Sequence, residues 1–344
     1  MEKRVLLVIS APGGGGAEES MSHLKTALRE QNVSTTLMSI NKSHFSMEGY
    51  HHADIVIGRD PESRLFGTLL SLIKFILTIV RLNPSFVVLN CELSETYGAF
   101  LPLRKAKLVV VEHANPSWVG RTKIGWLVRR ILNSRRATFI AVSPHITPPY
   151  KGNKYSAVIP NSFLFQDATI KTLVDKISRL VYIGRLSAIH KNPSALISIS
   201  NSLDLPVVFI GVGEERDTLR ELAESTGVTA TFTGWTSDPF KLLLPGDLLV
   251  VPSDREGDGL VVVQAIAYKV PLLLQDNIDL RKFDLPDKHY CKGVSGFIDS
   301  INTYRNSISS LVPSDLESLR IRNERDPRHV AKLWMDFLGI KTIR

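Results

Sequence analysis

The chain has 344 residues, of which 44% are hydrophobic, and a formal net charge of +8. Its composition is that of a soluble globular protein, and its length exceeds one ordinary core and suits two domains of about 150–170 residues each. The two cysteines, Cys91 and Cys291, lie far apart in the sequence and form neither a CxxC nor a Cys/His pattern of zinc ligands. We therefore expect a protein of the reducing cytosol without a structural zinc.

Short apolar runs alternating with longer segments predict parallel α/β units in the first half of the chain. In chain order we expect strands at 5–10, 33–39, 54–57, 86–90, 108–112 and 137–142, with helices at 17–31 and 65–80. A glycine loop at 13–16 follows the first strand. The apolar run at 5–9 is too short for a signal peptide. His51-His52 is expected to be a polar loop pair and not a metal site.

The second half starts its own alternating series after a join at 161–177. We expect strands at 180–183, 207–210, 231–232, 248–251 and 272–274, and helices at 192–202, 214–226, 263–268 and 329–338. The sequence therefore predicts a domain at 1–162, a second domain at 163–326, and a C-terminal segment at 327–344 whose helix crosses back to the first domain.

The charge is unevenly distributed between the two halves. Residues 1–160 contain 20 Lys and Arg against 11 Asp and Glu, a net charge of +9, and the rest is close to neutral. This asymmetry favours an anionic partner for the first domain, and no basic-aromatic nucleic-acid module is visible, so we expect an anionic membrane surface and no nucleic acid.

Two segments of the first half support membrane contact. The segment 118–139 interleaves Trp, Ile and Leu with basic residues that include Arg129, Arg130, Arg135 and Arg136. Such a helix can lie among headgroups, where each basic residue contributes about 1 kcal/mol, or it can pack on the core with a solvated basic face. The segment 65–80 is apolar but shorter than the roughly 20 residues that span a bilayer, so we expect a buried or interfacial helix.

The turn at 252–265 carries the clearest chemistry. An apolar strand ends before it, two glycines turn the chain, and a Val/Ala/Ile helix follows. Helix N–H groups at the end of a parallel strand bind phosphate, whereas the carboxylate of Glu256 suits the hydroxyls of a neutral polyol. A sugar beside a phosphate fits both features, and the alternative is an ordinary strand–turn–helix corner.

This turn resembles the nucleotide-sugar signature of the retaining glycosyltransferase family four, which has the two-domain GT-B fold. Glu256, Gly257, Gly259 and Leu260 match the signature. Asp258 replaces the usual aromatic or aliphatic residue, and Gln264 replaces a second Glu that accepts both ribose hydroxyls in relatives. The resemblance implies an α/β protein with two Rossmann-like domains that face each other across a cleft.

Further motifs in the second half resemble the same family. Gly184-Arg185-Leu186, with Lys191 six residues after the Arg, follows a strand and offers two cations to a diphosphate. The alternative for these cations is a solvated surface. Gly213, Gly234 and Trp235 lie at strand ends that line the nucleotide base in relatives, although each glycine alone would be an ordinary loop residue.

The first half contributes three weaker matches. Gly15 and Gly16 resemble a glycine loop that approaches the donor, and His113 follows a strand where relatives place a His against the donor sugar. Asn161 resembles the Pro-Asn-Gly at the domain junction. The alternatives are a ligand-free glycine turn, a structural His and a simple linker turn.

The resemblance implies a retaining, metal-independent glycosyltransferase that uses a nucleotide sugar, with UDP favoured and GDP possible. Arg185, Lys191 and the N–H groups from Gly257 to Val261 would stabilise the leaving diphosphate. Glu256 and His113 would hold the sugar. The implied acceptor is a glycan or lipid-linked molecule of bacterial cell-surface polysaccharide synthesis, such as lipopolysaccharide. No cofactor is implied.

We therefore expect a cytoplasmic protein that is peripheral on the inner face of the membrane. Two rival interpretations remain open at this point. The changes at Asp258 and Gln264 are compatible with a non-catalytic GT-B partner subunit, and an epimerase of sugar nucleotides could use the same fold.

Overall fold

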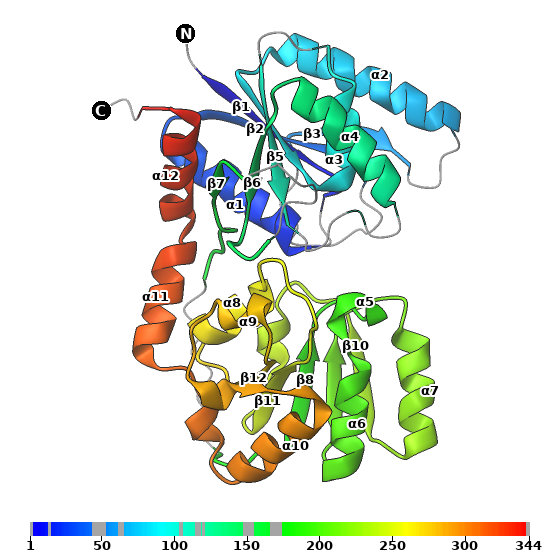
Figure 1. Ribbon diagram of the computed structural model, residues 1–344, viewed down its shortest axis with the longest axis vertical. Coiled ribbons are helices and arrows are strands. Elements are labelled where there is room, and N and C mark those ends of the chain that lie inside the picture. Colours follow the sequence, from blue (N-terminus) through cyan, green and yellow to red (C-terminus); the bar gives the residue numbers. More distant parts are fainter. Residues whose placement is uncertain are drawn as a thin grey trace. The chain divides into compact units, whose positions relative to one another are not determined.

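The computed structural model describes residues 3–12, 15–42, 53–60, 65–102, 106–113, 118, 121–146, 155–165 and 174–341. The glycines 13 and 14 and the pair His51-His52 lie outside these ranges. The chain divides into unit 1, Met1–Leu164 with Glu324–Arg344, and unit 2, Phe165–Asn323. Figure 1 shows one sheet with its helices in each unit.

The described part of unit 1 contains a seven-stranded parallel sheet in the order β3-β2-β1-β4-β5-β6-β7. Its strands are β1 (Arg4–Ile9), β2 (Ser34–Asn41), β3 (Ile55–Arg59), β4 (Phe86–Asn90), β5 (Lys107–Glu112), β6 (Thr138–Ala141) and β7 (Ala157–Val158). The helices between them are α1 (Gly16–Glu30), α2 (Leu65–Leu82), α3 (Cys91–Ala99) and α4 (Thr122–Ser134). The strand order reverses beside β1, which places the carboxyl ends of β1 and β4 at a crevice of the sheet.

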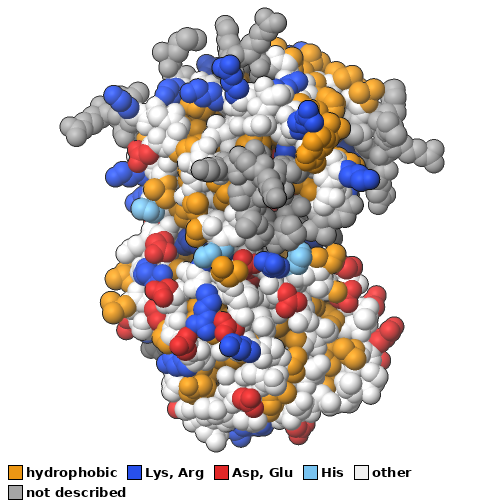
Figure 2. Space-filling model, viewed as in Figure 1, with side chains coloured by type: hydrophobic (Ala, Val, Ile, Leu, Met, Phe, Trp, Pro, Cys, Tyr) orange, Lys and Arg blue, Asp and Glu red, His pale blue; other side chains and the backbone are white. Residues whose placement is uncertain are grey.

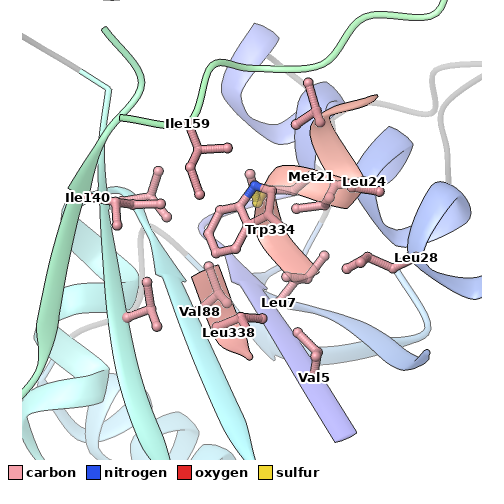
Figure 3. Close-up of a cluster of buried hydrophobic side chains, with 14 of the residues drawn as sticks. Val5, Leu7, Met21, Leu24, Leu28, Val88, Ile140, Ile159, Trp334 and Leu338 are labelled. Carbon is pink, nitrogen blue, oxygen red and sulfur yellow. The ribbon is translucent and has the colours of Figure 1, made fainter. Parts of the chain in front are cut away.

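One face of this sheet packs against α1 and the last helix, α12 (Pro327–Leu338). Alternate strand residues such as Val5, Leu7 and Val88 share a buried cluster with Leu24 of α1 and Trp334 of α12. Figure 3 shows the Trp334 ring among these strand and helix side chains. The C-terminal segment is therefore part of the unit 1 core, although it follows the whole of unit 2 in sequence.

The opposite face of the sheet packs against α2, α3 and α4. Leu6, Val8 and Val87 alternate with the residues above and share a second cluster with Phe75 of α2 and Leu132 of α4. α2 is half-buried, because Leu69, Leu70, Ile73, Leu77 and Val80 on its other side are 47–59% exposed. No helix in the described ranges is long and apolar enough to cross a membrane.

Unit 2 contains a second parallel sheet, with the described strands in the order β10-β9-β8-β11-β12-β13. These strands are β8 (Arg179–Ile183), β9 (Val207–Ile210), β10 (Ala230–Gly234), β11 (Asp247–Val251), β12 (Leu272–Gln275) and β13 (Tyr290–Cys291). The longer helices are α6 (Ser194–Leu203), α7 (Arg216–Thr226), α8 (Leu260–Ala267), α10 (Gly293–Tyr304) and α11 (Asp315–Arg325). Short turns of helix are α5 (Ala188–Lys191), α9 (Ile278–Arg281), η1 (Pro239–Leu242), η2 (Asp287–His289) and η3 (Ile308–Leu311).

Candidate functional site

The candidate residues of unit 2 lie in loops that follow the carboxyl ends of neighbouring strands. Lys191 follows β8, Gly213 follows β9, Gly234 ends β10, and Glu256 follows β11. Because these strands are parallel and adjacent, their carboxyl ends lie along one edge of the sheet. The fold therefore brings four separated sequence motifs to the same edge of unit 2.

Lys191 lies in a strained turn after β8. The residues on both sides of it, His190 and Asn192, have left-handed φ angles of 69° and 49°. Non-glycine residues in this region cost on the order of 1–3 kcal/mol each and are concentrated at functional sites. The carbonyl of His190 accepts hydrogen bonds from the N–H groups of Asp254 (2.8 Å) and Arg255 (3.3 Å), which ties this turn to the loop after β11.

The same two loops are joined by an ion pair. Lys191 Nζ lies 2.5 Å from Glu256 Oε1, and the two side chains are 33% and 10% exposed. The ammonium has three donors and the carboxylate several acceptor sites, so each group can keep this contact and still bind a ligand. The pair therefore presents a fixed cation beside a fixed hydrogen-bond acceptor.

The loop of Glu256 is supported from behind by α9 and the residues around it. Asp279 Oδ2 accepts the Glu256 N–H at 3.1 Å, and Asn277 Nδ2 donates to the carbonyl of Ser253 at 2.8 Å. Lys282 Nζ donates to the carbonyl of Gly257. Asp279 is 1% exposed and its Oδ1 has no hydrogen-bond partner among the described residues. These residues were not singled out by the sequence, because no motif connects them to the turn.

Helix α8 begins at Leu260 after Gly259, whose φ of 74° is left-handed. Its first N–H groups lack intrahelical acceptors and carry the positive end of the helix dipole. Leu260, Val261 and Gln264 are partly exposed, whereas Val262 and Val263 are buried. Three predicted donor-binding residues thus share the accessible face of α8, and Asp258 before it is buried in the turn.

The glycines after β9 allow this loop to pack closely against the backbone of the loop after β8. A Cβ at Gly213 would lie 2.1 Å from the carbonyl oxygen of Leu186, and one at Gly211 would lie 1.9 Å from that of Gly184. Gly213 is therefore required by the neighbouring backbone whether or not a nucleotide lies there. Gly234 differs, because its φ of 79° favours glycine while its missing Cβ faces open space. The half-buried Trp235 follows it directly.

Arg185 is exposed, and the described residues offer its guanidinium no hydrogen bond or salt bridge. Its charge nevertheless acts on Glu214, which accepts a hydrogen bond from Ser187 Oγ at 2.6 Å. That hydrogen bond, with a smaller contribution from Arg185, lowers the pKa of Glu214 below its usual value. Arg185 therefore lies near the loop after β9 and differs from Lys191 in having no paired carboxylate.

The unit 1 candidates lie at the corresponding edge of the other sheet. His113 follows β5, and its ring contacts Asn90 Oδ1 at the end of β4 and Asn161 Nδ2 at 3.4 Å. Asn161, predicted as a linker or donor residue, is buried. Gly15 precedes α1 and Gly16 begins it, and a Cβ at Gly15 would meet only the carboxylate of Glu18 at 2.8 Å.

A buried ion cluster lies beside these residues. Arg129 of α4 is 1% exposed, and its Nε lies 2.8 Å from Glu95 Oε2, while its Nη2 also contacts Glu112. Burial lowers the pKa of Arg129, but the hydrogen bonds to Glu95 and the charge of Glu112 raise it overall. Arg129 thus cannot belong to a solvated basic face, and its expected contact with a membrane is wrong.

Cys91 begins α3 with a left-handed φ of 72°. Burial, followed by the charges of Glu18, Glu95, Glu112 and Glu92, raises the pKa of its thiol well above the usual value. The thiolate is the nucleophilic form, so Cys91 is unsuited to covalent chemistry. Among the described residues, no three His, Cys, Asp or Glu side chains are grouped so that they could hold a metal ion.

Residues 166–281 match the family model described as glycosyl transferases group 1. This segment contains Arg185, Lys191 and Glu256. The matched segment lies within unit 2. The putative glycosyltransferase EpsD of Bacillus subtilis (strain 168) is 35% identical over 105 residues, which cover 28% of this chain and 27% of that relative. The match therefore spans about a quarter of the curated relative.

Solved structures resemble the whole chain at low sequence identity. Anabaena HepE, in complex with UDP and glucose, aligns with a TM-score of 0.80 and 17% identity over 98% of this chain and 100% of that one. Sucrose-phosphate synthase from Thermosynechococcus elongatus aligns with a TM-score of 0.77 and 15% identity over 99% and 100%. The lipopolysaccharide outer core galactosyltransferase WaaB gives 0.71 and 14% over 98% and 99%. The predicted α/β, GT-B architecture is thereby confirmed.

Proposed function

We propose that the chain is a retaining glycosyltransferase of family four that moves a sugar from a nucleotide-diphosphate donor to a glycan or lipid-linked acceptor. The observation that carries the proposal is the Lys191–Glu256 pair, which joins the loops after β8 and β11 inside the matched domain. A cation for phosphate and an acceptor for sugar hydroxyls are the two groups that a nucleotide sugar requires side by side.

The chemical task is to stabilise charge on the departing diphosphate. The exposed guanidinium of Arg185, the ammonium of Lys191 and the first N–H groups of α8 are the donors for this charge. One preorganised contact of this kind contributes roughly 2.7–4 kcal/mol to the transition state. In this proposal the cations take the place of a metal ion, the leaving phosphate accepts the acceptor's proton, and no side chain acts as general base.

Gln264 is the position where donor binding departs from the family pattern. It lies on the accessible face of α8, and its amide oxygen can accept one ribose hydroxyl. A charged hydrogen bond contributes roughly 1.5–3 kcal/mol against about 1 for a neutral one, so Gln264→Glu should tighten binding of a nucleoside diphosphate by about tenfold and Gln264→Leu should weaken it.

The donor is best sought with a thermal-shift panel of UDP, GDP and ADP sugars, followed by assays of hydrolysis and transfer. We favour UDP, because solved structures of similar fold such as HepE and the O-GlcNAc transferase GtfA hold UDP. Stabilisation with hydrolysis or transfer supports the proposal. Binding without turnover supports a non-catalytic partner subunit, an epimeric sugar nucleotide supports an epimerase, and no binding contradicts all three.

We further propose that unit 1 binds an anionic membrane through its α2–α4 layer, which would place acceptors of lipopolysaccharide or a related polysaccharide within reach. α2 exposes five large aliphatic side chains, and α4 exposes Ile124, Trp126 and Leu127 on the same side of the sheet. Lys123 and Arg130 are exposed beside them, and on the face of unit 1 that Figure 2 shows, Lys and Arg side chains outnumber Asp and Glu. Apolar anchors flanked by cations bind anionic bilayers.

Vesicle sedimentation tests this surface. The chain should bind phosphatidylglycerol vesicles, bind phosphatidylcholine vesicles much less, and dissociate with added salt. Lys123→Glu/Arg130→Glu should abolish binding. The control Lys332→Glu/Lys341→Glu makes the same charge change at exposed positions within and just after α12, which packs on the other face of the sheet. Equal binding by both double variants would contradict the proposed surface.

A further inference from the structure

The amino edge of the unit 1 sheet, where its parallel strands begin, carries an unbalanced positive charge. We call cationic edge the described residues that lead into and begin the neighbouring strands β1, β4, β5 and β6. These are residues 3–4, 81–86, 101–102, 106–107 and 133–138. They contain no Asp or Glu and six exposed cations: Lys3, Arg4, Arg81, Lys107, Arg135 and Arg136.

Helix ends account for only part of this charge. Helices that follow parallel strands end at the amino edge of the sheet, and cations interact favourably with their last carbonyl groups. Three of the six cations donate to backbone carbonyl groups at or just after the ends of α12, α2 and α3: Lys3, Arg4 and Arg135. The other three make no hydrogen bond or salt bridge among the described residues: Arg81, Lys107 and Arg136.

The corresponding edge of unit 2 shows that the architecture does not require such a charge. Strands β8, β11, β12 and β13 occupy the same places in the strand order as β1, β4, β5 and β6. The residues that lead into and begin them, 175–179, 242–247, 268–272 and 286–290, contain four Lys or Arg against three Asp. Arg179 and Asp247 of this set form an ion pair of 2.6 Å. The charge excess of the cationic edge therefore has a cause other than the fold.

The arrangement of the cationic edge fits a linear polyanion. Neighbouring strands lie about 4.8 Å apart, so the beginnings of four strands form a row of roughly 15 Å. None of its residues is an exposed large hydrophobic side chain. Protein interfaces have a largely apolar core, and membrane-inserted helices need apolar anchors, so neither partner fits this edge. A row of cations without apolar contacts attracts a chain of repeated negative charges.

We propose that the cationic edge binds an anionic glycan, a polysaccharide with carboxylate or phosphate groups along its chain. The glycan part of this inference rests on the proposed function, which supplies a glycan as acceptor or product, whereas the polyanion part rests on the edge alone. β1 spans six residues, or about 20 Å, between this edge and the opposite edge, where the candidate residues of unit 1 lie. The cationic edge therefore holds a distant part of the glycan and not its reacting end.

Fluorescence anisotropy with labelled alginate, a linear polymer that has one carboxylate per sugar, tests this edge. Wild type should bind alginate but not neutral dextran, and added salt should weaken binding because the contacts join exposed charges. Arg81→Glu/Lys107→Glu should weaken alginate binding by roughly tenfold or more, since two attractive contacts become repulsive. The control Lys176→Glu/Lys288→Glu makes the same charge change at exposed positions of the unit 2 edge and should bind like wild type. Equal affinity of the two double variants would overturn the proposal.

Duplex DNA and phosphatidylglycerol vesicles are measured with the same variants. Tighter binding of either than of alginate, lost in Arg81→Glu/Lys107→Glu, would overturn the assignment to a glycan. A nucleoside diphosphate distinguishes this proposal from the proposed function. Binding of the nucleoside diphosphate without binding of alginate overturns the role of the cationic edge and leaves the proposed function standing. Binding of alginate without any nucleoside diphosphate supports the polyanion site and contradicts the proposed function.

Discussion

Arg129 and Arg130 are neighbours on α4 with opposite environments. Arg130 is exposed and its guanidinium lies over the Trp126 ring, whereas Arg129 is enclosed with Glu95 and Glu112. The alternation of basic and apolar residues in the sequence does not distinguish them. The distinction depends on Glu95, which lies on α3, and on the end of β5, so it appears only when both elements are in place.

Arg129→Ala should lower the free energy of unfolding by about 3–5 kcal/mol, because it leaves buried carboxylates without their cation. Arg130→Ala is the matched control and should cost less than about 1 kcal/mol. Urea unfolding of both variants measures the difference. Equal destabilisation by the two substitutions would show that Arg129 is not part of a buried ion cluster.

At the scale of elements, short apolar runs located the strands well. The strands at 86–90 and 207–210 have the predicted bounds, and the other predicted strands differ by one or two residues at their ends. The two-residue strands β7 and β13 were not predicted. Parallel strands buried on both faces are continuously apolar, which makes them easy to recognise. The helices at 91–99, 293–304 and 315–325 were not predicted. α3 begins directly after β4, so no loop residues mark its start in the sequence. In α11, Leu316 and Leu319 are exposed, so the leucines of this helix do not mark a single buried face.

The sequence predicted the residues of the candidate site that belong to motifs, but not the residues that support them. Lys191, Glu256 and Gly213 were found because they belong to contiguous motifs at strand ends. The supports around them, Asp279 and Lys282, act through contacts with backbone atoms of a loop more than twenty residues away. Such contacts leave no spacing in the sequence, so only the fold reveals them.

Substitutions of Asp279 test how much the hydrogen bond from the Glu256 N–H to α9 contributes to ligand binding by the turn. Asp279→Ala removes the acceptor of the Glu256 N–H and should weaken binding of a nucleoside diphosphate by about 5- to 150-fold, since an unpaired buried group costs about 1–3 kcal/mol. Asp279→Asn keeps an oxygen acceptor and should stay within about threefold of wild type. Isothermal titration with UDP measures both. Wild-type affinity in Asp279→Ala would show that the turn holds its geometry without α9.

At the scale of the whole molecule, each sheet belongs to its own compact unit, and the last helix, α12, packs in the core of unit 1. Their stabilities can therefore respond differently to pH. In unit 2, burial lowers the pKa of His289 below 6.5, and its Nδ1 lies 3.0 Å from the Leu272 carbonyl at the start of β12. The folded state therefore binds a proton at His289 less readily than the unfolded chain does, where the imidazole has its ordinary pKa of 6.5.

Unit 2 should lose stability as pH falls below about 6.5, because the unfolded chain then binds a proton that the folded state does not. The hydrogen bond from Arg281 lowers the pKa of Asp276 below 3.8, so its contribution is lost only at more acidic pH. Urea titrations between pH 7.5 and 5, with unfolding followed by hydrogen exchange of the 272–275 segment, measure this slope. His289→Gln keeps a donor for Leu272 and should flatten the slope, whereas the exposed His329→Gln in unit 1 should not. An unchanged slope in His289→Gln would contradict the assignment.

The central claim is that unit 2 binds the diphosphate of a nucleotide sugar between the loops after β8 and β11. Isothermal titration of wild type, Arg185→Ala, Lys191→Ala and the control Arg220→Ala with the nucleoside diphosphate selected by the donor panel, UDP in our expectation, tests it most directly. We expect binding by wild type and control, and affinity lower by about 10- to 150-fold in each of the other two, the equivalent of about 1.5–3 kcal/mol for a charged hydrogen bond. Equal affinity in all four proteins would contradict the claim.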